Sequence, residues 1–199
     1  HPKDGVFPEK VKEGREKAGD KQSKVITFPV PQMIKQDSED NFFLTPKSNQ
    51  SSVVTIISKA ISLHSQGMIS EATKYYQHCI NQGFTDPRVY SNYGIILKDK
   101  GKLKEAEYCL RKATELNPNN AESYSNLGSI LNELRKSTEA ELCFRKAIQI
   151  NPNFVNAYNN LGVLLKNQGK LNDAIIYFKK TIEIDSKFSP ALNSIATIF

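Results

Sequence analysis

Small and apolar residues in the central part of the chain recur with the spacing of a helix face. Between residues 90 and 97 they fall at i, i+3, i+4 and i+7, and between 103 and 113 they fall at i, i+3, i+7 and i+10, which also lie on one helix face. This is the pattern of two amphipathic helices, each with one face turned to a neighbour. Gly101 lies between the two stretches, where a helix commonly ends in a left-handed cap. The pattern therefore predicts a pair of helices joined by a tight turn.

The helix pair is repeated with a fixed period. The fragments YSNYG at 90–94, YSNLG at 124–128 and YNNLG at 158–162 follow one another at intervals of 34 residues. In this register, position 8 is small, position 20 is alanine and position 24 is bulky. The expected blocks are 53–86, 87–120, 121–154 and 155–188, with a partial block at 189–199. A period of this length is typical of a solenoid, in which each unit buries its apolar face against the next.

These features resemble the tetratricopeptide repeat (TPR) family over Val53 to Phe199. The resemblance implies an all-α, right-handed superhelical solenoid of antiparallel helix pairs. Small residues at positions 8 and 20 would let the two helices approach closely beside the bulky residue at 24. Pro118 and Pro152 at position 32 would stop the second helix of their blocks. One block departs from the pattern, because Arg135 stands where three other blocks have glycine, which predicts the loosest turn of the array.

The ends of the chain differ from the repeats. Residues 1–52 carry five of the nine prolines and show no sustained period, which predicts a disordered tail or linker. Two short apolar stretches in it, 25–31 and 41–46, have the alternative interpretation of extended docking motifs. At the other end, Ile195 and Phe199 belong to a first helix with no second helix after it. We therefore expect the native chain to continue beyond Phe199.

Composition narrows the function classes. The formal net charge is +6, of which residues 53–199 carry +5, from 18 basic and 13 acidic side chains. Cys79, Cys109 and Cys143 have neither disulfide-framework nor zinc-site spacing, so we expect reduced, mostly buried thiols in a cytoplasmic protein. His64 and His78 have no nucleophile or carboxylate in a catalytic pattern, and we expect them on the surface. No apolar run has the length of a membrane span. The sequence thus predicts no catalytic residues, no metal and no cofactor.

The candidate site is a peptide-binding groove. The TPR resemblance implies that positions 2, 5, 6, 9, 12 and 13 of the first helices line it. Asparagine recurs at position 6, similar to the asparagine ladder in the repeat arm of protein O-GlcNAc transferases, and each amide offers donors and an acceptor to a peptide backbone. The alternative is that asparagine is simply common at this position across the family and has no binding role here. The candidate residues are Asn92, Asn126, Asn160, Arg88, Ser91, Lys98, Ser125, Asn132, Asn159 and Lys166.

Two other binding modes are less favoured. A carboxylate clamp needs a basic pair on the third helix, where this chain has Glu122 and Asn126, or Asn156 and Asn160 one block later. A basic stripe at positions 25 and 26 lies four residues after Glu107 and Glu141, a spacing that indicates helical ion pairs more than nucleic-acid binding. No aromatic residues are interleaved with that stripe to stack on bases.

The leading hypothesis is a non-catalytic scaffold for protein–protein interaction that binds an extended, uncharged or weakly acidic peptide. The alternative is the substrate-recruiting arm of a larger enzyme, glycosyltransferase- or sulfotransferase-like, whose catalytic domain lies beyond Phe199. TPR arrays of this kind in bacteria are often joined to such domains. The sequence does not specify the partner, since repeat scaffolds share a framework and differ in a few groove residues.

Overall fold

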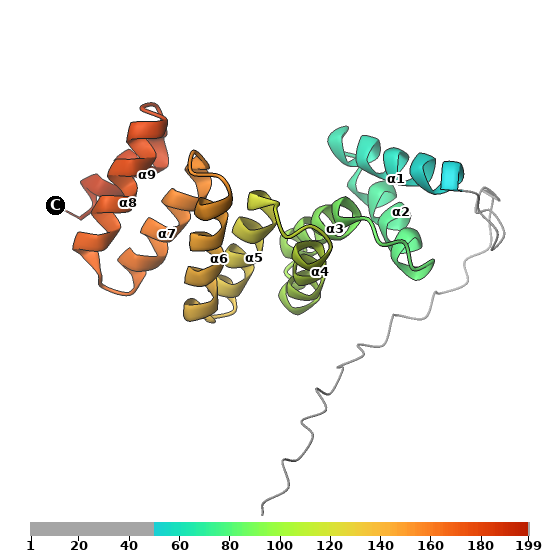
Figure 1. Ribbon diagram of the computed structural model, residues 1–199, viewed down its shortest axis with the longest axis horizontal. Helices are drawn as coiled ribbons and strands as arrows, with labels where there is room; N and C mark the ends of the chain where they lie inside the picture. The colour runs from blue at the N-terminus through green and yellow to red at the C-terminus, as the bar shows by residue number, and fades with distance from the viewer. Residues whose placement is uncertain (1–49, 199) are drawn as a thin grey trace, which may run out of the picture. The chain divides into compact units, whose positions relative to one another are not determined.

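The computed structural model describes residues 50–198, and every regular element among them is an α-helix (Figure 1). The nine helices are α1 (Gln50–Ser65), α2 (Ile69–Asn81), α3 (Pro87–Asp99), α4 (Leu103–Leu116), α5 (Ala121–Glu133), α6 (Ser137–Ile150), α7 (Val155–Asn167), α8 (Leu171–Ile184) and α9 (Ser189–Ala196). They confirm the predicted all-α fold of paired helices. Most of the predicted tail and Phe199 lie outside the described residues. The boundary between residues 52 and 53 and the handedness of the superhelix stay predictions.

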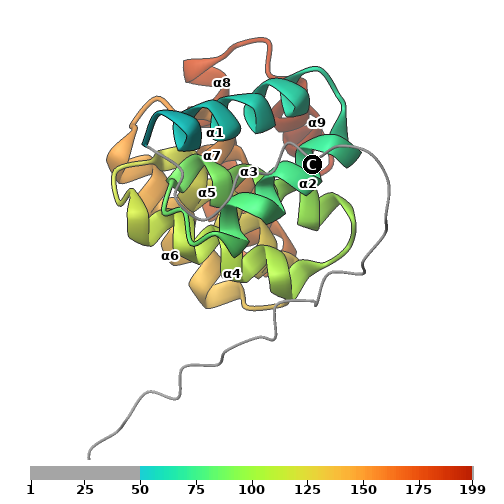
Figure 2. The same ribbon diagram turned by 90° about the vertical axis from the view of Figure 1, so that its right-hand side faces the viewer.

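The helices form two layers. Each first helix packs against its own second helix, and α1, α3, α5, α7 and α9 also contact one another in succession. Among the helices described, consecutive second helices make no such backbone contact. Figure 2 shows the same arrangement along the array, with α3, α5 and α7 in the interior and α4 and α6 at the periphery. Because first helices of neighbouring repeats touch one another and the described second helices of neighbouring repeats do not, the array bends toward the first helices, which form its inner face.

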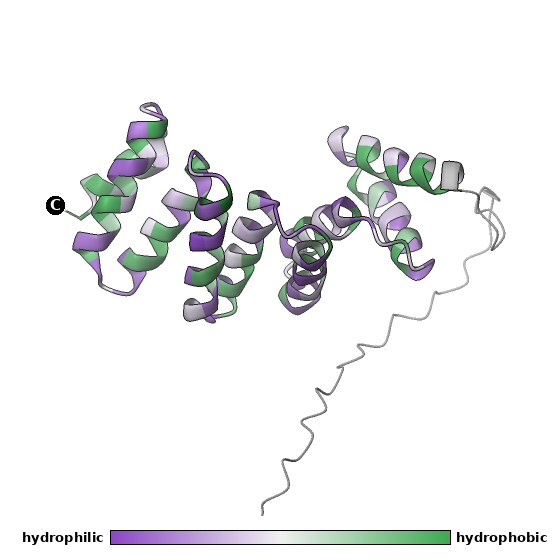
Figure 3. Ribbon diagram, in the orientation of Figure 1, coloured by the Kyte–Doolittle hydropathy of each residue, from purple (hydrophilic) through white to green (hydrophobic). Residues whose placement is uncertain are grey.

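In the second, third and fourth repeats the close contact between the two helices is made by glycine against a bulky side chain. A Cβ atom added to Gly128 would lie 2.7 Å from Cε1 of Phe144, and one added to Gly162 would lie 2.7 Å from Cε1 of Phe178. Phe144 and Phe178 are almost completely buried. This confirms the prediction that a small residue at position 8 lets the two helices approach closely beside the bulky residue at position 24. Figure 3 shows the apolar residues gathered where the helices of a pair face each other.

The turns inside the repeats share one backbone conformation. Gly67, Gly101 and Gly169 have φ angles of +77°, +72° and +77°, and Arg135 takes the same left-handed conformation at +62°. A side chain in this region meets a steric penalty that glycine avoids. The structure therefore confirms that Arg135 occupies a left-handed position in the third repeat.

Helix ends elsewhere follow ordinary capping. The Asp86 side chain accepts from the backbone N–H of Arg88 at 2.8 Å, and Asn120 accepts from that of Ser123 at 2.8 Å. Asn117 and Asn151 end α4 and α6 in extended conformations, with φ of −136° and −131°, as expected of residues before proline. The caps at Asp86 and Asn120 fix where α3 and α5 begin, whereas α7 and α9, of the helices described, begin without a side-chain cap.

Long side chains connect the outer helices that the backbones leave apart. Arg111 on α4 forms ion pairs with Glu107 and with Glu139 on α6, and Lys136 reaches Glu107 at 2.8 Å. Burial opposes ionisation of Glu107, but hydrogen bonds from Lys136 and Arg111 hold its pKa below the ordinary value. Arg145 likewise pairs with Glu141 at 2.8 Å. Arg111 and Arg145, the arginines of the predicted basic stripe, are therefore paired with carboxylates.

Replacing Arg135 with glycine tests the strain in the third turn. Arg135→Gly removes the steric penalty of a positive φ, so we expect the free energy of unfolding to rise by about 1 kcal/mol. Urea denaturation followed by circular dichroism measures the change. The matched variant Gly101→Ala, at the same position of the second repeat, should lower it by a similar amount. A loss of stability in Arg135→Gly would contradict this explanation of the turn.

Candidate functional site

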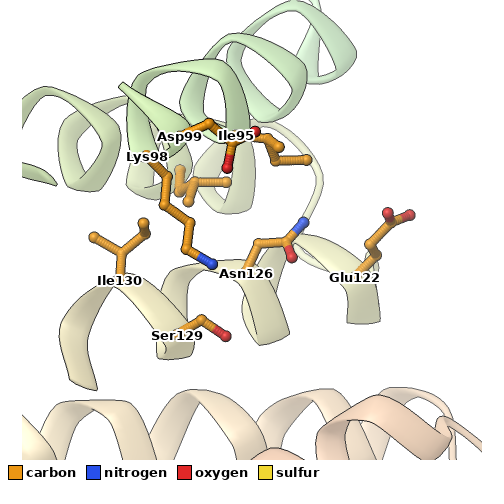
Figure 4. Close-up of a pocket in the computed structure, with 8 residues that line it drawn as sticks. Ile95, Lys98, Asp99, Glu122, Asn126, Ser129 and Ile130 are labelled. Carbon is orange, nitrogen blue, oxygen red and sulfur yellow. The ribbon is translucent and has the colours of Figure 1, made fainter. Parts of the chain in front are cut away.

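Two shallow hollows lie on the inner face formed by the first helices. The first has a volume of about 120 Å³ and lies between α3 and α5. Lys98 and Asp99 border it from α3, Asn126 and Ser129 border it from α5, and Leu110 contributes an apolar wall. Figure 4 shows Lys98 reaching from α3 toward α5, and Asn126 on α5 facing α3.

The second hollow, of about 200 Å³, continues along the same face from α5 to α7. Asn132 and Glu133 on α5 and Asn160 on α7 line it, together with Phe144 of α6. Lys98 borders both hollows, and its ammonium lies 3.4 Å from the Glu133 carboxylate. Apart from Leu110, Ile130 and Phe144, the residues around the hollows come from positions 2, 6, 9, 12 and 13, which are among those expected to line a groove.

The first member of the asparagine ladder is engaged within the protein. The Asn92 amide donates to the hydroxyl of Tyr76 at 3.1 Å. Tyr76 is the buried residue at position 24 of the first repeat, and its hydroxyl also lies 3.4 Å from Nδ1 of His64. His64 is therefore half-buried against Tyr76, which differs from the expectation of a surface residue. Asn92 helps to satisfy a buried hydroxyl and is less available to a ligand.

The second member has no such partner. Position 24 of the preceding repeat is Leu110, which has no hydroxyl, and the Asn126 Nδ2 atom is buried without a hydrogen-bond partner among the described residues. An unsatisfied buried amide costs about 1–3 kcal/mol. Asn160 is intermediate, since its amide donates to Ser129 Oγ over a long 3.4 Å. Among the three asparagines of the ladder, Asn126, in the middle of the face, is therefore the one whose amide most clearly lacks a hydrogen-bond acceptor within the described chain.

The other candidate residues are spread around this centre. The Arg88 guanidinium is held by Asp86 through two hydrogen bonds, of 3.1 and 2.8 Å. Ser125 is only 3% exposed, so we leave it out of the proposed site. The Lys166 ammonium donates to Thr197 at 3.0 Å. The half-buried Ser91 hydroxyl accepts from Ser123 at 3.5 Å.

The last candidate residue is Asn159, and sequence reasoning also missed residues that line the two hollows. The Asn159 Oδ1 atom is buried and unpartnered within the part of the chain described. Ser129, a residue of the expected groove, borders both hollows, and Ile95 and Val163, which sequence reasoning did not name, add apolar surface to one hollow each. All three occupy position 9, so the period of the groove positions was the signal that could have found Ile95 and Val163.

The described side chains offer little for catalysis. Burial raises the pKa of Cys79 to about 11, of Cys109 to about 12 and of Cys143 to about 11, so these thiols stay protonated near neutral pH. Within residues 50–198, no group of three or more His, Cys, Asp or Glu side chains could hold a metal ion. No helix in this part of the chain is long and apolar enough to cross a membrane. The arrangement is suited to binding through amides, hydroxyls and apolar contacts.

Replacing Asn126 with leucine tests whether its amide is unsatisfied. Asn126→Leu removes a buried polar group with no partner, so the free energy of unfolding should rise by about 1 kcal/mol. The matched variant Asn92→Leu should lower it by about 1 kcal/mol, because the Tyr76 hydroxyl loses a donor. Urea denaturation of both variants gives the comparison. Equal destabilisation by the two changes would contradict the assignment of Asn126 as unpartnered.

Models of known protein families match the part of the chain in which the structure shows paired helices. A model described as "TPR repeat" matches residues 94–134, and two described as "Tetratricopeptide repeat" match 121–154 and 143–176. A model described as PsaD matches residues 1–43, which the structure does not describe. No curated protein matches the sequence.

Solved structures provide a second comparison. A crystal structure of MamA is 25% identical, with a TM-score of 0.64 over 70% of this chain and 81% of that one. YrrB, titled "a TPR protein with an unusual peptide-binding site", is 23% identical, with a TM-score of 0.64 over 75% and 77%, and this likeness shows the fold alone. The first TPR of Spaghetti, bound to the HSP90 peptide SRMEEVD, is 25% identical, with a TM-score of 0.55 over 56% and 89%.

Proposed function

Because this chain is a tetratricopeptide repeat protein, a protein-interaction fold, we propose that it binds an extended peptide along the inner face of α3, α5 and α7. The observation that carries the proposal is the Asn126 amide, buried without an acceptor beside an open hollow. Since that nitrogen is buried, the Asn126 side chain would have to turn toward the hollow, where a backbone carbonyl of a bound peptide would supply the acceptor. The two neighbouring hollows give such a peptide a path along the face.

An extended backbone suits this surface better than a helix. Amide side chains donate to and accept from the backbone of an extended strand, whereas a helix satisfies its own backbone groups. The hydrogen bonds of Asn126 and Asn160 would hold the peptide with little dependence on its sequence. Ile95 and Val163 would contact apolar side chains of the peptide, since each borders one hollow.

The charges of the hollows favour an uncharged segment. Lys98 is accompanied by Asp99 and Glu122 at the first hollow and by Glu133 at the second, so their formal charges are −1 and 0. Arg88, which would have made the face more basic, is held by Asp86. Of the uncharged and weakly acidic segments expected from the sequence, we propose the uncharged one. The same carboxylates disfavour an acidic peptide and a carboxylate clamp.

The hypothesis of a substrate-recruiting arm uses the same surface. In that case the bound peptide would belong to a substrate, and this array would select it for a catalytic domain elsewhere. Both hypotheses require that Asn126 and Asn160 contact the peptide.

The experiment is a selection from a phage-displayed library of random peptides, followed by fluorescence anisotropy with the selected peptides. Asn92, Asn126 and Asn160 are replaced together by alanine. Because each lost hydrogen bond costs about 1 kcal/mol, we expect the affinity to fall about tenfold or more. The single variant Asn126→Ala should account for the largest part of this loss of affinity, since the Asn92 amide is already hydrogen-bonded to Tyr76.

The control variant replaces three exposed asparagines away from the inner face: Asn119 and Asn153, which lie in turns between repeats, and Asn172, which lies in the first turn of α8. It changes the same number of amides and should leave the affinity unchanged. Circular dichroism verifies that both variants keep their helical content. Undiminished affinity in the groove variant, with folding intact, would refute the proposed site.

A further inference from the structure

Basic side chains gather at three of the turns between a first helix and its second helix. Residues 100–104, 134–138 and 168–172, here called the turn edge, cover three of these turns and the first two residues of α4, α6 and α8. They contain six basic side chains and no acidic one, and they are flanked directly by Asp99, Glu105, Glu133, Glu139 and Asp173. The six basic residues are Lys100, Lys102, Lys104, Arg135, Lys136 and Lys170. Since the formal charge of the whole chain is +6, the remaining residues sum to zero.

The repeat geometry brings these charges to one edge of the array. Each turn follows a first helix, and successive first helices lie against one another. Figure 1 shows the α5–α6 and α7–α8 turns on the same side of the helices. Lys102, Lys136 and Lys170 also stand at the N-caps of α4, α6 and α8, without a capping hydrogen bond from the side chain. The partial positive charge of each helix N-terminus adds to that of the lysine.

Most of these cations lack a carboxylate partner. Lys102 lies 3.3 Å from Glu105, and Lys136 lies 2.8 Å from Glu107. Glu139 and Asp173 also lie in the first turns of α6 and α8, and Glu139 is paired with Arg111.

Four cations remain without an ion pair among the described residues: Lys100, Lys104, Arg135 and Lys170. All four are exposed, and Lys100 donates to the Thr73 hydroxyl at 3.3 Å. Their charges therefore face solvent.

We propose that the turn edge is a second docking surface, which binds an acidic, extended polypeptide segment. Carboxylates of the partner would pair with the four unpaired cations, one turn after another along the array. Leu171 is 42% exposed on this edge and offers an apolar contact between the charges. A nucleic acid is less well matched, because the turn edge contains no aromatic side chain on which bases could stack. The surface is separate from the inner face and does not depend on the proposed groove.

The experiment uses the full chain and a fluorescein-labelled peptide of alternating glutamate and leucine, measured by fluorescence anisotropy at several salt concentrations. The test variant combines Lys100→Gln, Lys104→Gln, Arg135→Asn and Lys170→Gln, with asparagine chosen because it tolerates a left-handed φ. The control variant replaces Lys59, Lys74, Lys179 and Lys187 with glutamine. These four lysines are exposed, lie outside the turn edge and make no ion pair within residues 50–198, so the net charge changes equally.

We expect the wild type to bind the peptide with an affinity that falls as salt rises, and the test variant to bind about tenfold more weakly or worse. The control variant should lose much less. Equal losses in both variants would show a response to net charge alone and would overturn the proposal. Tighter binding of an oligothymidylate or of phosphatidylserine vesicles, lost in the same test variant, would overturn the assignment to a polypeptide.

Discussion

The contact between a glycine on α3, α5 or α7 and a leucine or phenylalanine side chain on the second helix of the same repeat is the constraint on which the array depends. Gly128 against Phe144 and Gly162 against Phe178 leave no room for even a methyl group without movement. Close approach at this point buries the ring and fixes how the two helices face each other. Because the same contact recurs every 34 residues, the same helix positions face the inner surface in each repeat. The position of the proposed binding face is therefore a consequence of the core.

The identity of the buried residue at position 24 also affects the groove. Where this residue is Tyr76, its hydroxyl accepts a hydrogen bond from the amide of Asn92. Where it is Leu110, the amide of Asn126 is left buried and unpartnered. A substitution in the core thus changes how available a groove residue is to a ligand. The cost of the unsatisfied amide is understandable if a peptide satisfies it, which links a local loss of stability to function.

The sequence was sufficient to predict the helix pairs, the glycine contacts and the left-handed turn at Arg135, because each depends on the spacing of a few residue types. It was also sufficient to place the groove positions on one face. It was not sufficient to separate Asn92 from Asn126, since their difference depends on which side chain of the neighbouring repeat lies opposite. Nor did it show that Asp86 holds Arg88, or that Ser125 is buried, because both depend on side-chain packing in three dimensions.

The central claim is that the inner face binds a peptide through its asparagine amides. The most direct test is to follow the side-chain NH₂ resonances of the asparagines by NMR while titrating a peptide selected on the wild-type protein. The account predicts shifts for Asn126 and Asn160, with Asn119 and Asn153 in the outer loops unchanged. Shifts confined to the outer loops or the second helices, with Asn126 unaffected at saturation, would contradict it.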